Sequence, residues 1–454
     1  MPLRSIVFML YFCGSCTATL MVPMIGVICY IVLYHVYPQT TWWGAALEPL
    51  GIRYSFICGV CLLVGTLLNL NRLRFGRHFV SGVEWGFAVF IFAVLVSSVM
   101  VAEWNPRSEV ALDKMLKVFL FVFMLSHVVV TRHRLWQLTL VFTLVSLYLG
   151  YEAKNAPPSA FNQNRLDGLG GPDFRESAAL AIHLFALIPF VAIVFRQRSW
   201  GLKSLAFLAA GFSINAILLC RARTAFVSGI IAGTLALWYI PKRHRRWAVS
   251  VLLIGLCGGV FLSDSYFRER MVTIFSSAEE RDKSSAHRLL IWESAWRMIQ
   301  GRPMGVGIGR FEFEIGHYAP PEVFIIAETA RRDAHNTYIL CAAELGIIGL
   351  ASFLGIIGTA WWTLGRLSRQ VRTLENPDRL ELIIFANRLS LLVYLVSGFF
   401  VSRLYTEGMW LFLALPACID RAVYNEVREH AGQAVIVELP QLGWNPEAQE
   451  VVLS

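Results

Sequence analysis

The stretch TYILCAAELGIIGLASFLGIIGTAWW, residues 337–362, decides the fold of this chain. It exceeds the roughly 20 apolar residues that a helix needs to cross a bilayer, and Glu344 is its one charged side chain. Directly before it stand His335 and Asn336, and before these lies a polar segment over 264–334. A loop outside the membrane therefore ends, and a membrane-spanning helix begins, beside a titratable imidazole.

The composition of the whole chain is that of an integral membrane protein. Of its 454 residues, 56% are hydrophobic and 16% are charged, whereas about a quarter of the residues of a soluble domain are charged. The net charge of +9 does not indicate nucleic-acid binding. The basic residues gather in short loops between apolar runs, a pattern that sets the orientation of membrane proteins.

The nine cysteines lie in or beside apolar runs, so they predict no disulfide framework. CGSC (13–16) and CGVC (58–61) are C-x-x-C pairs, but no nearby histidine or acid completes a zinc site. We interpret these cysteines as small packing residues in helices, and we expect no metal and no cofactor.

Twelve apolar segments are candidates for membrane-spanning helices. They are residues 6–36, 54–70, 82–101, 115–130, 135–151, 177–195, 202–219, 225–240, 247–262, 338–362, 382–400 and 405–420. The first contains Pro23, so it forms either one kinked helix or two shorter ones. The pattern predicts an all-α polytopic membrane protein with about 12 transmembrane helices. An even number places both termini on the same side.

Basic clusters between these segments decide the orientation. They are Arg72, Arg74 and Arg77; Arg132 and Arg134; Arg196, Arg198 and Lys203; the run PKRHRR (241–246); and Arg366, Arg369 and Arg372. In an alternating count all of them fall on one side, which the positive-inside rule makes cytoplasmic. The segments that then face outward are 37–53, 102–114, 152–176, 220–224, 264–335 and 401–407.

This alternation divides the chain into four parts. Residues 1–263 form an N-terminal transmembrane bundle of about nine spans. Residues 264–335 form one large periplasmic loop that contains amphipathic helices. Residues 336–423 are the C-terminal transmembrane helices, and 424–454 are a polar cytoplasmic tail.

The short outward turn CRART (220–224) breaks the charge pattern, because Arg221 and Arg223 lie on the side that should be poor in positive charge. Positive charge on the outward side opposes the predicted orientation, so we expect these arginines to have an interaction partner that compensates. Either both arginines snorkel to lipid headgroups, or they form an anion site at the membrane surface.

Within the large loop, SSAHRLLIWESAWRMIQGRP (284–303) reads as a helix, with a serine to cap its start and glycine and proline at its end. Arg288 falls in its first turn, where its charge and the free N–H groups of the helix start favour an anion. Alternatively, Arg288 snorkels or pairs with Glu279, Glu280 or Asp282. Arg288 shares an apolar face, typical of a helix on a bilayer or over a site, with Trp292, Ala295, Trp296 and Ile299.

The segment PMGVGIGRFEF (303–313) lacks the spacing of a nucleotide loop, so we interpret it as a tight turn that returns the chain to the membrane. His335 then opens the next span, either as an interfacial hydrogen-bonding residue or as a general base, since histidine titrates near neutrality. Glu344 in the same span indicates either function or a buried partner.

Three passages together resemble the O-antigen ligase and polymerase family of bacterial inner-membrane glycosyltransferases: RART (221–224), HRLLIWESAWRMIQGRPMGVGIGRFEF (287–313) and HNTYILCAAELGIIGL (335–350). The passage PMIGVICYIVLYHVYPQTTWW (23–43) resembles the branch of O-glycosylation ligases found with exosortase systems. The resemblance implies that a glycan moves en bloc from a polyprenyl diphosphate carrier to an acceptor hydroxyl at the periplasmic face of the inner membrane. It also implies a largely helical fold similar to that of lipid-linked sugar transferases.

Carried over by position, Arg223, Arg288 and His335 match two arginines and a histidine of the family. We expect the arginines to stabilise the departing diphosphate, with Arg221 as support, and His335 to accept the proton of the attacking hydroxyl. A single displacement would invert the anomeric centre. The first outward loop offers only Glu48 as a carboxylate, which favours a metal-independent reaction.

Other residues near the outward ends of spans are candidates for substrate binding. The loop RLDGLGGPDFRES (165–177) resembles a family region, although Asp173 replaces the asparagine expected there. Lys117 either touches phosphate or snorkels. The full set of substrate-binding candidates is Arg221, Arg165, Arg175, Lys117, Asn336 and Glu344.

Other functions stay open on the sequence alone. A polymerase that joins repeat units would use the same catalytic parts with another acceptor. A transporter or flippase would place charge along a path through the bilayer, whereas the unusual charges here lie on one face, which favours transfer. A scaffold gives no reason for the outward arginines. Expected partners are the polyprenyl diphosphate-linked glycan, a glycan, lipid or protein hydroxyl, and membrane lipids, but no nucleic acid.

Overall fold

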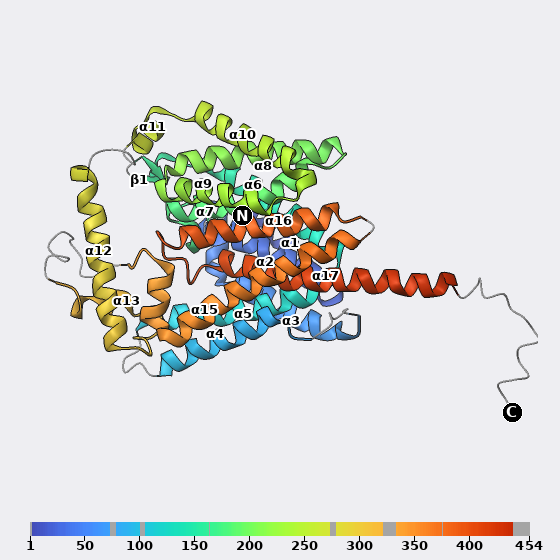
Figure 1. Ribbon diagram of the computed structural model, residues 1–454, viewed down its shortest axis with the longest axis horizontal. Coiled ribbons are helices and arrows are strands. Elements are labelled where there is room, and N and C mark those ends of the chain that lie inside the picture. Colours follow the sequence, from blue (N-terminus) through green and yellow to red (C-terminus); the bar gives the residue numbers. More distant parts are fainter. Residues whose placement is uncertain are drawn as a thin grey trace, which may run out of the picture.

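Helices make up nearly all of the computed structural model (Figure 1), which describes residues 2–72, 79–99, 105–162, 164–272, 278–320, 333–374 and 376–438. The helices before the large loop are α1 (Leu3–Met21), α2 (Pro23–Val36), α3 (Tyr54–Leu68), α4 (Gly82–Val99), α5 (Pro106–Val128), α6 (Arg132–Lys154), α7 (Ser177–Phe195), α8 (Trp200–Cys220), α9 (Arg223–Tyr239) and α10 (Arg245–Leu262). The loop contributes α11 (Ser265–Val272), α12 (Ala278–Gly301) and α13 (Phe311–Glu314). After it come α15 (Thr337–Gln370), α16 (Asp378–Ser397) and α17 (Glu407–Glu438). One antiparallel ribbon, β1 (Phe161–Asn162) with β2 (Arg165–Leu166), pairs Phe161 with Leu166.

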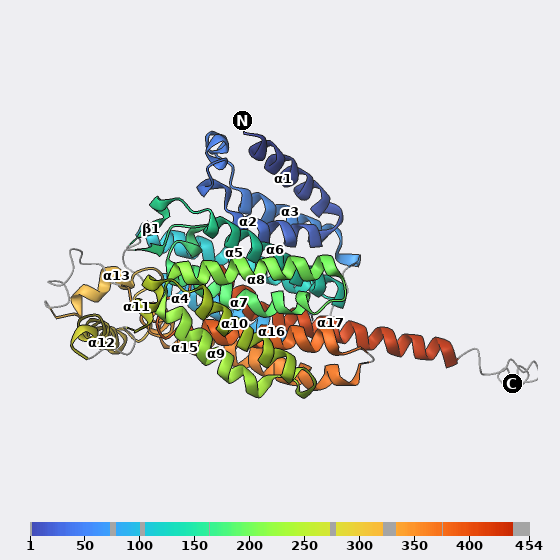
Figure 2. The ribbon, with the colours of Figure 1, turned by 90° about the horizontal axis from the view of Figure 1, so that it is seen from above.

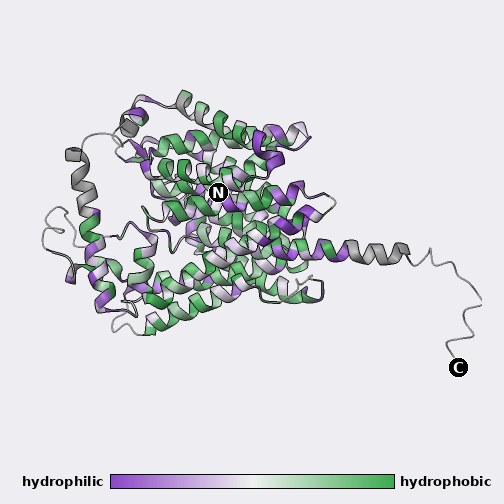
Figure 3. Ribbon diagram, in the orientation of Figure 1, coloured by the Kyte–Doolittle hydropathy of each residue, from purple (hydrophilic) through white to green (hydrophobic). Residues whose placement is uncertain are grey.

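Each predicted span overlaps a helix in the described part of the chain, in agreement with an all-α membrane protein. Among the described residues, α1, α4, α7, α8, α15 and α16 are long and apolar enough to cross a membrane. The helices at the other predicted spans are shorter or more polar, as with α2 at 14 residues, so the count of twelve crossings stays a prediction. Figure 3 shows mainly hydrophobic bundle helices with hydrophilic residues gathered toward the loops.

The first predicted span is two antiparallel helices rather than one kinked helix. Pro23 begins α2 after an extended Val22, since proline suits the first turn of a helix but cannot continue one. Ser5 Oγ, at the start of α1, donates a hydrogen bond of 2.7 Å to the Trp43 carbonyl beyond α2. Residues 2–5 therefore lie beside the 37–53 loop, at the end of the bundle opposite the C-terminal tail. This differs from the expectation that both termini share one side.

Two ends of the bundle can be defined. The loop end holds segments 37–53, 152–176, 220–222 and 398–406, and the basic end holds 129–131, 240–246 and 371–378. Figures 1 and 2 both place α12 at the loop end and the projecting part of α17 at the other. Ion pairs between distant segments join groups predicted on the same side: Lys114–Asp173, Arg221–Asp264 and Arg403–Glu176 at the loop end, and Arg132–Glu426, Arg243–Glu381 and Arg366–Asp420 at the basic end.

One fully buried ion pair joins α4, α5 and α17 toward the basic end. Arg421 donates to both carboxylate oxygens of Glu84, at 3.0 and 2.7 Å, and both side chains are 3% exposed. The Ser126 hydroxyl donates to the same carboxylate. Because a buried charge is tolerated only when paired and hydrogen-bonded, this cluster fixes how the three helices meet.

Candidate active site at the loop end of the bundle

The turn between α8 and α9 is held by Arg221. This residue ends α8 in the left-handed conformation, with φ of 45°, and α9 begins two residues later at Arg223. The Arg221 guanidinium donates to the Asn164 carbonyl and to the Asp264 carboxylate, and it lies 5.1 Å from the centre of the Tyr266 ring. Asp264 is therefore the compensating partner that the charge pattern predicts. Arg221 is only 8% exposed, so it positions the turn that carries Arg223.

Arg223 and Arg288 come together although α9 and α12 are separated by α10 and α11 in the chain. Burial lowers the pKa of the Arg288 guanidinium, and the nearby charge of Arg223 lowers it further. The side chains of Glu279, Glu280 and Asp282, the alternative partners of Arg288, lie outside the described residues. Two close cations favour an anion between them.

Helix α12 is docked beside the histidine segment. The indole Nε1 of Trp292 donates a 2.9 Å hydrogen bond to the carbonyl of Ala334, directly before His335. Arg288 lies one helical turn before Trp292, so it is held near the same segment. The buried face of α12 holds Ile291, Ala295 and Met298. Trp296, predicted on the apolar face, is instead 59% exposed, because it follows Ala295 and points about 100° away from it.

His335 presents a half-exposed imidazole next to a carboxylate. Its Nδ1 lies 3.4 Å from an Asp333 oxygen, and its side chain is 48% exposed. Its backbone N–H donates to the same carboxylate at 3.3 Å, and its φ of 47° is left-handed. Nε2 contacts no polar group of the described chain. Proton transfer by a histidine base uses a carboxylate beside one ring nitrogen and access to the other, and the position of Asp333 fits the first requirement.

Asn336 caps α15. Its Oδ1 accepts hydrogen bonds from the backbone N–H groups of Tyr338 and Ile339, at 2.9 and 3.0 Å. Its Nδ2 donates to the carbonyl of Phe399 at 3.3 Å, and the residue is 4% exposed. Asparagine at this position satisfies the free N–H groups of a helix start. Asn336 thus fixes the point where the chain enters α15 directly after His335.

The glycine-rich segment docks against a break in α15. Gly346 interrupts the helix with φ of 68° and ψ of −169°. Val306 N donates to Ala343 O at 2.9 Å, and Ile347 N donates to Pro303 O at 3.0 Å. A Cβ at Gly346 would lie 2.4 Å from the Met304 carbonyl carbon, so only glycine permits this approach. The segment forms a turn, as the sequence predicts, and its backbone docks on α15. Its return to the membrane stays a prediction.

Glu344 is the anchor of that turn. Its carboxylate accepts the N–H groups of Gly309 and Phe311, both at 2.9 Å, and the hydroxyl of Tyr405. The side chain is buried, with the residue 2% exposed. Of the two readings of this intramembrane carboxyl group, the buried partner fits: Glu344 binds protein donors from the glycine turn and from the segment between α16 and α17.

Comparison with known families agrees with this geometry. Residues 208–354 match the sequence profile of a family described as O-antigen ligase. This segment is similar to an O-antigen ligase domain. It runs from within α8 to beyond the break in α15, and so it contains the Arg223 turn, α12, His335 and the glycine turn. No curated protein matches the chain.

The remaining candidates lie on the border of the ligase domain or outside it. Arg165 sits on the β-ribbon beside Asn164, whose carbonyl binds Arg221, so the ribbon approaches the Arg223 turn. Arg175 is exposed. Lys117 pairs with Asp113 on its own helix and lies 5.7 Å from the centre of the Phe56 ring. No contact joins Lys117 to the arginine pair within the described chain.

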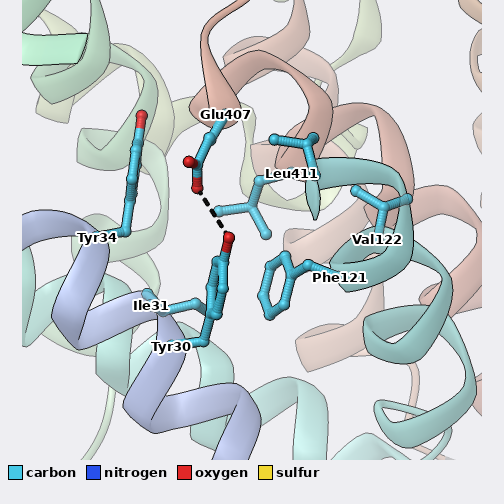
Figure 4. Close-up of a pocket in the computed structure, with 8 residues that line it drawn as sticks. Tyr30, Ile31, Tyr34, Phe121, Val122, Glu407 and Leu411 are labelled. Carbon is cyan, nitrogen blue, oxygen red and sulfur yellow. Dashed lines mark hydrogen bonds between the residues drawn. The ribbon is translucent and has the colours of Figure 1, made fainter. Parts of the chain in front are cut away.

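A second polar cluster at the loop end was not predicted from sequence. Asp173 pairs with Lys114, accepts the Tyr34 hydroxyl at 3.0 Å and caps α17 by accepting the Glu407 N–H at 2.9 Å. A charged residue in place of asparagine therefore has a structural reason here. The Glu407 side chain accepts the Tyr30 hydroxyl at 3.3 Å and lines a narrow pocket with both tyrosines (Figure 4).

Proposed function

We propose that this protein transfers a glycan from a polyprenyl diphosphate carrier to an acceptor hydroxyl at the loop end of the bundle, which faces the periplasm. The family match supports a membrane enzyme of glycan ligation or polymerisation. The observation that carries the proposal is the proximity of Arg223 to the half-buried Arg288, where burial and the second charge lower the pKa of Arg288. Helix α12, which carries Arg288, is hydrogen-bonded through Trp292 to the residue before the half-exposed His335. Binding a diphosphate between the two guanidinium groups would relieve their repulsion.

The reaction is a single displacement. The acceptor oxygen attacks the anomeric carbon, the bond from that carbon to the diphosphate oxygen breaks, and its electron pair leaves with the diphosphate. Arg223 and Arg288 stabilise the charge that develops on the leaving group, because oriented cations act strongly where water is partly excluded. The anomeric centre is inverted. The cations supply the stabilisation that metal-dependent transferases draw from a divalent ion, so we expect activity in excess chelator.

His335 takes the proton of the acceptor hydroxyl on Nε2. Asp333 holds Nδ1 at 3.4 Å, so it orients the ring and stabilises the imidazolium that forms. Asp333 is thus a positioning residue. Arg221, Asn336 and Glu344 belong to the same support: each fixes one of the segments that carry Arg223, His335 and α12.

The proposal is tested by neutralising the arginines in protein reconstituted with a polyprenyl diphosphate-linked oligosaccharide. Arg288→Gln and Arg223→Gln should each lower the rate at limiting donor by about 10²-fold, the usual effect of removing one transition-state donor. Arg297→Gln is the matched control on the same helix, since Arg297 is exposed and pairs with Glu293 one turn before it. Full activity in Arg288→Gln would exclude its role with the leaving group.

Ligase and polymerase differ only in the acceptor. Supplying wild-type protein with a lipid-core acceptor, a protein acceptor or a second repeat unit separates them by product. A transporter of the lipid-linked sugar would move the donor across vesicles without releasing polyprenyl diphosphate. The neighbouring Arg223 and Arg288 and the half-exposed His335, all at one end of the bundle, favour transfer over transport.

A further inference from the structure

A buried arginine lies in α16 far from the proposed active site. Arg388 is 8% exposed, and its Nε is buried with no hydrogen-bond partner. The guanidinium makes no ion pair and no hydrogen bond with any residue the structure describes. A charge inside a membrane-spanning helix is expensive and normally pairs with another group. We therefore expect Arg388 to have a partner other than the side chains that the structure describes.

Two aromatic rings form a corner around this guanidinium. Its central carbon lies 5.2 Å from the centre of the Tyr239 ring and 5.8 Å from that of the Trp361 ring. The two rings stand at 89° to each other, with centres 5.1 Å apart. Cation–π contact offsets part of the desolvation cost. The rings flank the guanidinium on two sides, and its N–H groups are of the kind that matches phosphate oxygens.

The corner lies at the rim of the bundle, near the basic end. Tyr239 is the last residue of α9 and is 39% exposed. Trp238 and Trp362 beside it are 77% and 67% exposed. Trp238 lies at the end of α9, and exposed tryptophans at helix ends are typical of the headgroup level of a membrane. A lipid phosphate at that level can reach Arg388 from the side.

The nearby carboxylates are already engaged by other arginines. Arg243, just beyond α9, pairs with both Asp378 and Glu381 at the start of α16. Arg372 lies 3.4 Å from the same Glu381. Basic residues outnumber acids in the connections at this end, so the local field favours an anionic ligand.

We infer that Arg388, with Tyr239 and Trp361, binds the phosphate of a lipid headgroup in the leaflet at the basic end. Two lipids offer this chemistry, an anionic phospholipid and a polyprenyl phosphate. The site is distinct from the Arg223–Arg288 pair, which lies at the opposite end of the bundle. It does not depend on the proposed glycan transfer.

To test this inference, the full chain is purified in detergent and transferred into nanodiscs. The bound lipid is then counted by native mass spectrometry. One arm mixes phosphatidylglycerol with phosphatidylcholine, and another mixes polyprenyl phosphate with phosphatidylcholine. We expect the wild type to retain the phosphate-bearing lipid selectively. Arg388→Gln should reduce retention roughly tenfold or more, as loss of a charged hydrogen bond would.

Arg379→Gln is the matched control. Arg379 lies on the same helix, 4.5 Å from the centre of the Trp136 ring, but it donates to Gln197 Oε1 at 3.1 Å. It should retain lipid as the wild type does. Equal retention by Arg388→Gln and wild type overturns the inference, as does an equal loss in both variants. A wild type without preference for the phosphate-bearing lipid overturns it even if Arg388→Gln does not fold, and the arm with the stronger retention identifies the lipid.

Discussion

Replacing Glu344 with glutamine tests whether this carboxylate holds the glycine turn or binds substrate. The carboxylate accepts two backbone N–H groups and the Tyr405 hydroxyl. In Glu344→Gln, one oxygen becomes an NH2 group that cannot accept, so Gly309 or Phe311 loses its partner. An unsatisfied buried donor costs about 1–3 kcal/mol, which corresponds to roughly 5- to 150-fold faster opening of the turn.

Hydrogen–deuterium exchange over 303–313 measures this opening directly. We expect the amides of Gly309 and Phe311 to exchange faster in Glu344→Gln, with a lower temperature of unfolding. Glu312→Gln is the control, because Glu312 pairs with the exposed Arg107 and such pairs contribute only about 0–1 kcal/mol. Unchanged exchange in Glu344→Gln together with weaker donor binding would refute the anchoring role and restore the substrate-binding interpretation.

Three further changes follow from the same contacts. Asp333→Asn should lower kcat about tenfold or more, because it weakens the orientation of His335. KM for the donor and the unfolding temperature should stay constant. Initial rates that match the wild type would exclude a positioning role for Asp333. Gly346→Ala should lower the free energy of unfolding by about 1–3 kcal/mol or more from its positive φ alone, whereas Gly355→Ala, with open space around it, should be neutral in the same thermal assay. Arg421→Met removes the guanidinium that pairs with the buried Glu84, so it should destabilise the fold by about 3–5 kcal/mol. Adding Glu84→Gln should recover part of that loss. No recovery would mean that lost packing of the arginine stem causes most of the destabilisation.

Much of the bundle could be predicted because hydrophobic run length reports directly on membrane helices. The run 337–362 predicts one helix, and the structure keeps that helix but breaks it at Gly346. The break depends on residues 303–311, which dock from a separate segment. Periodicity within one window carries no information about such a partner. Pro23 was a sufficient local signal for the split between α1 and α2, and only the contact of Ser5 with Trp43 sets their directions.

The residues of the candidate site likewise include some that the local sequence could predict and some that depend on distant segments. Arg223 could be found because charge on the outward side violates the positive-inside pattern, and Arg288 because it falls in the first turn of a predicted helix. Asn336 and Glu344 could be singled out as polar residues in or beside a span. Asn336 binds Phe399, and Glu344 binds Gly309 and Phe311. Because these partners are distant in sequence, the structural roles of both residues could not be predicted. Arg388, like Glu344, is an ionisable residue inside a predicted span, and such residues indicate a function or a buried partner.

The central claim is that the loop end breaks a glycosyl–diphosphate bond with His335 as the base. The most direct measurement is the amount of polyprenyl diphosphate released per minute by reconstituted wild-type protein and by His335→Ala, with donor and acceptor both saturating. We expect steady release by the wild type. In the variant, the release rate should fall by about 10²- to 10⁴-fold while the unfolding temperature stays unchanged. Release by His335→Ala at close to the wild-type rate would contradict it.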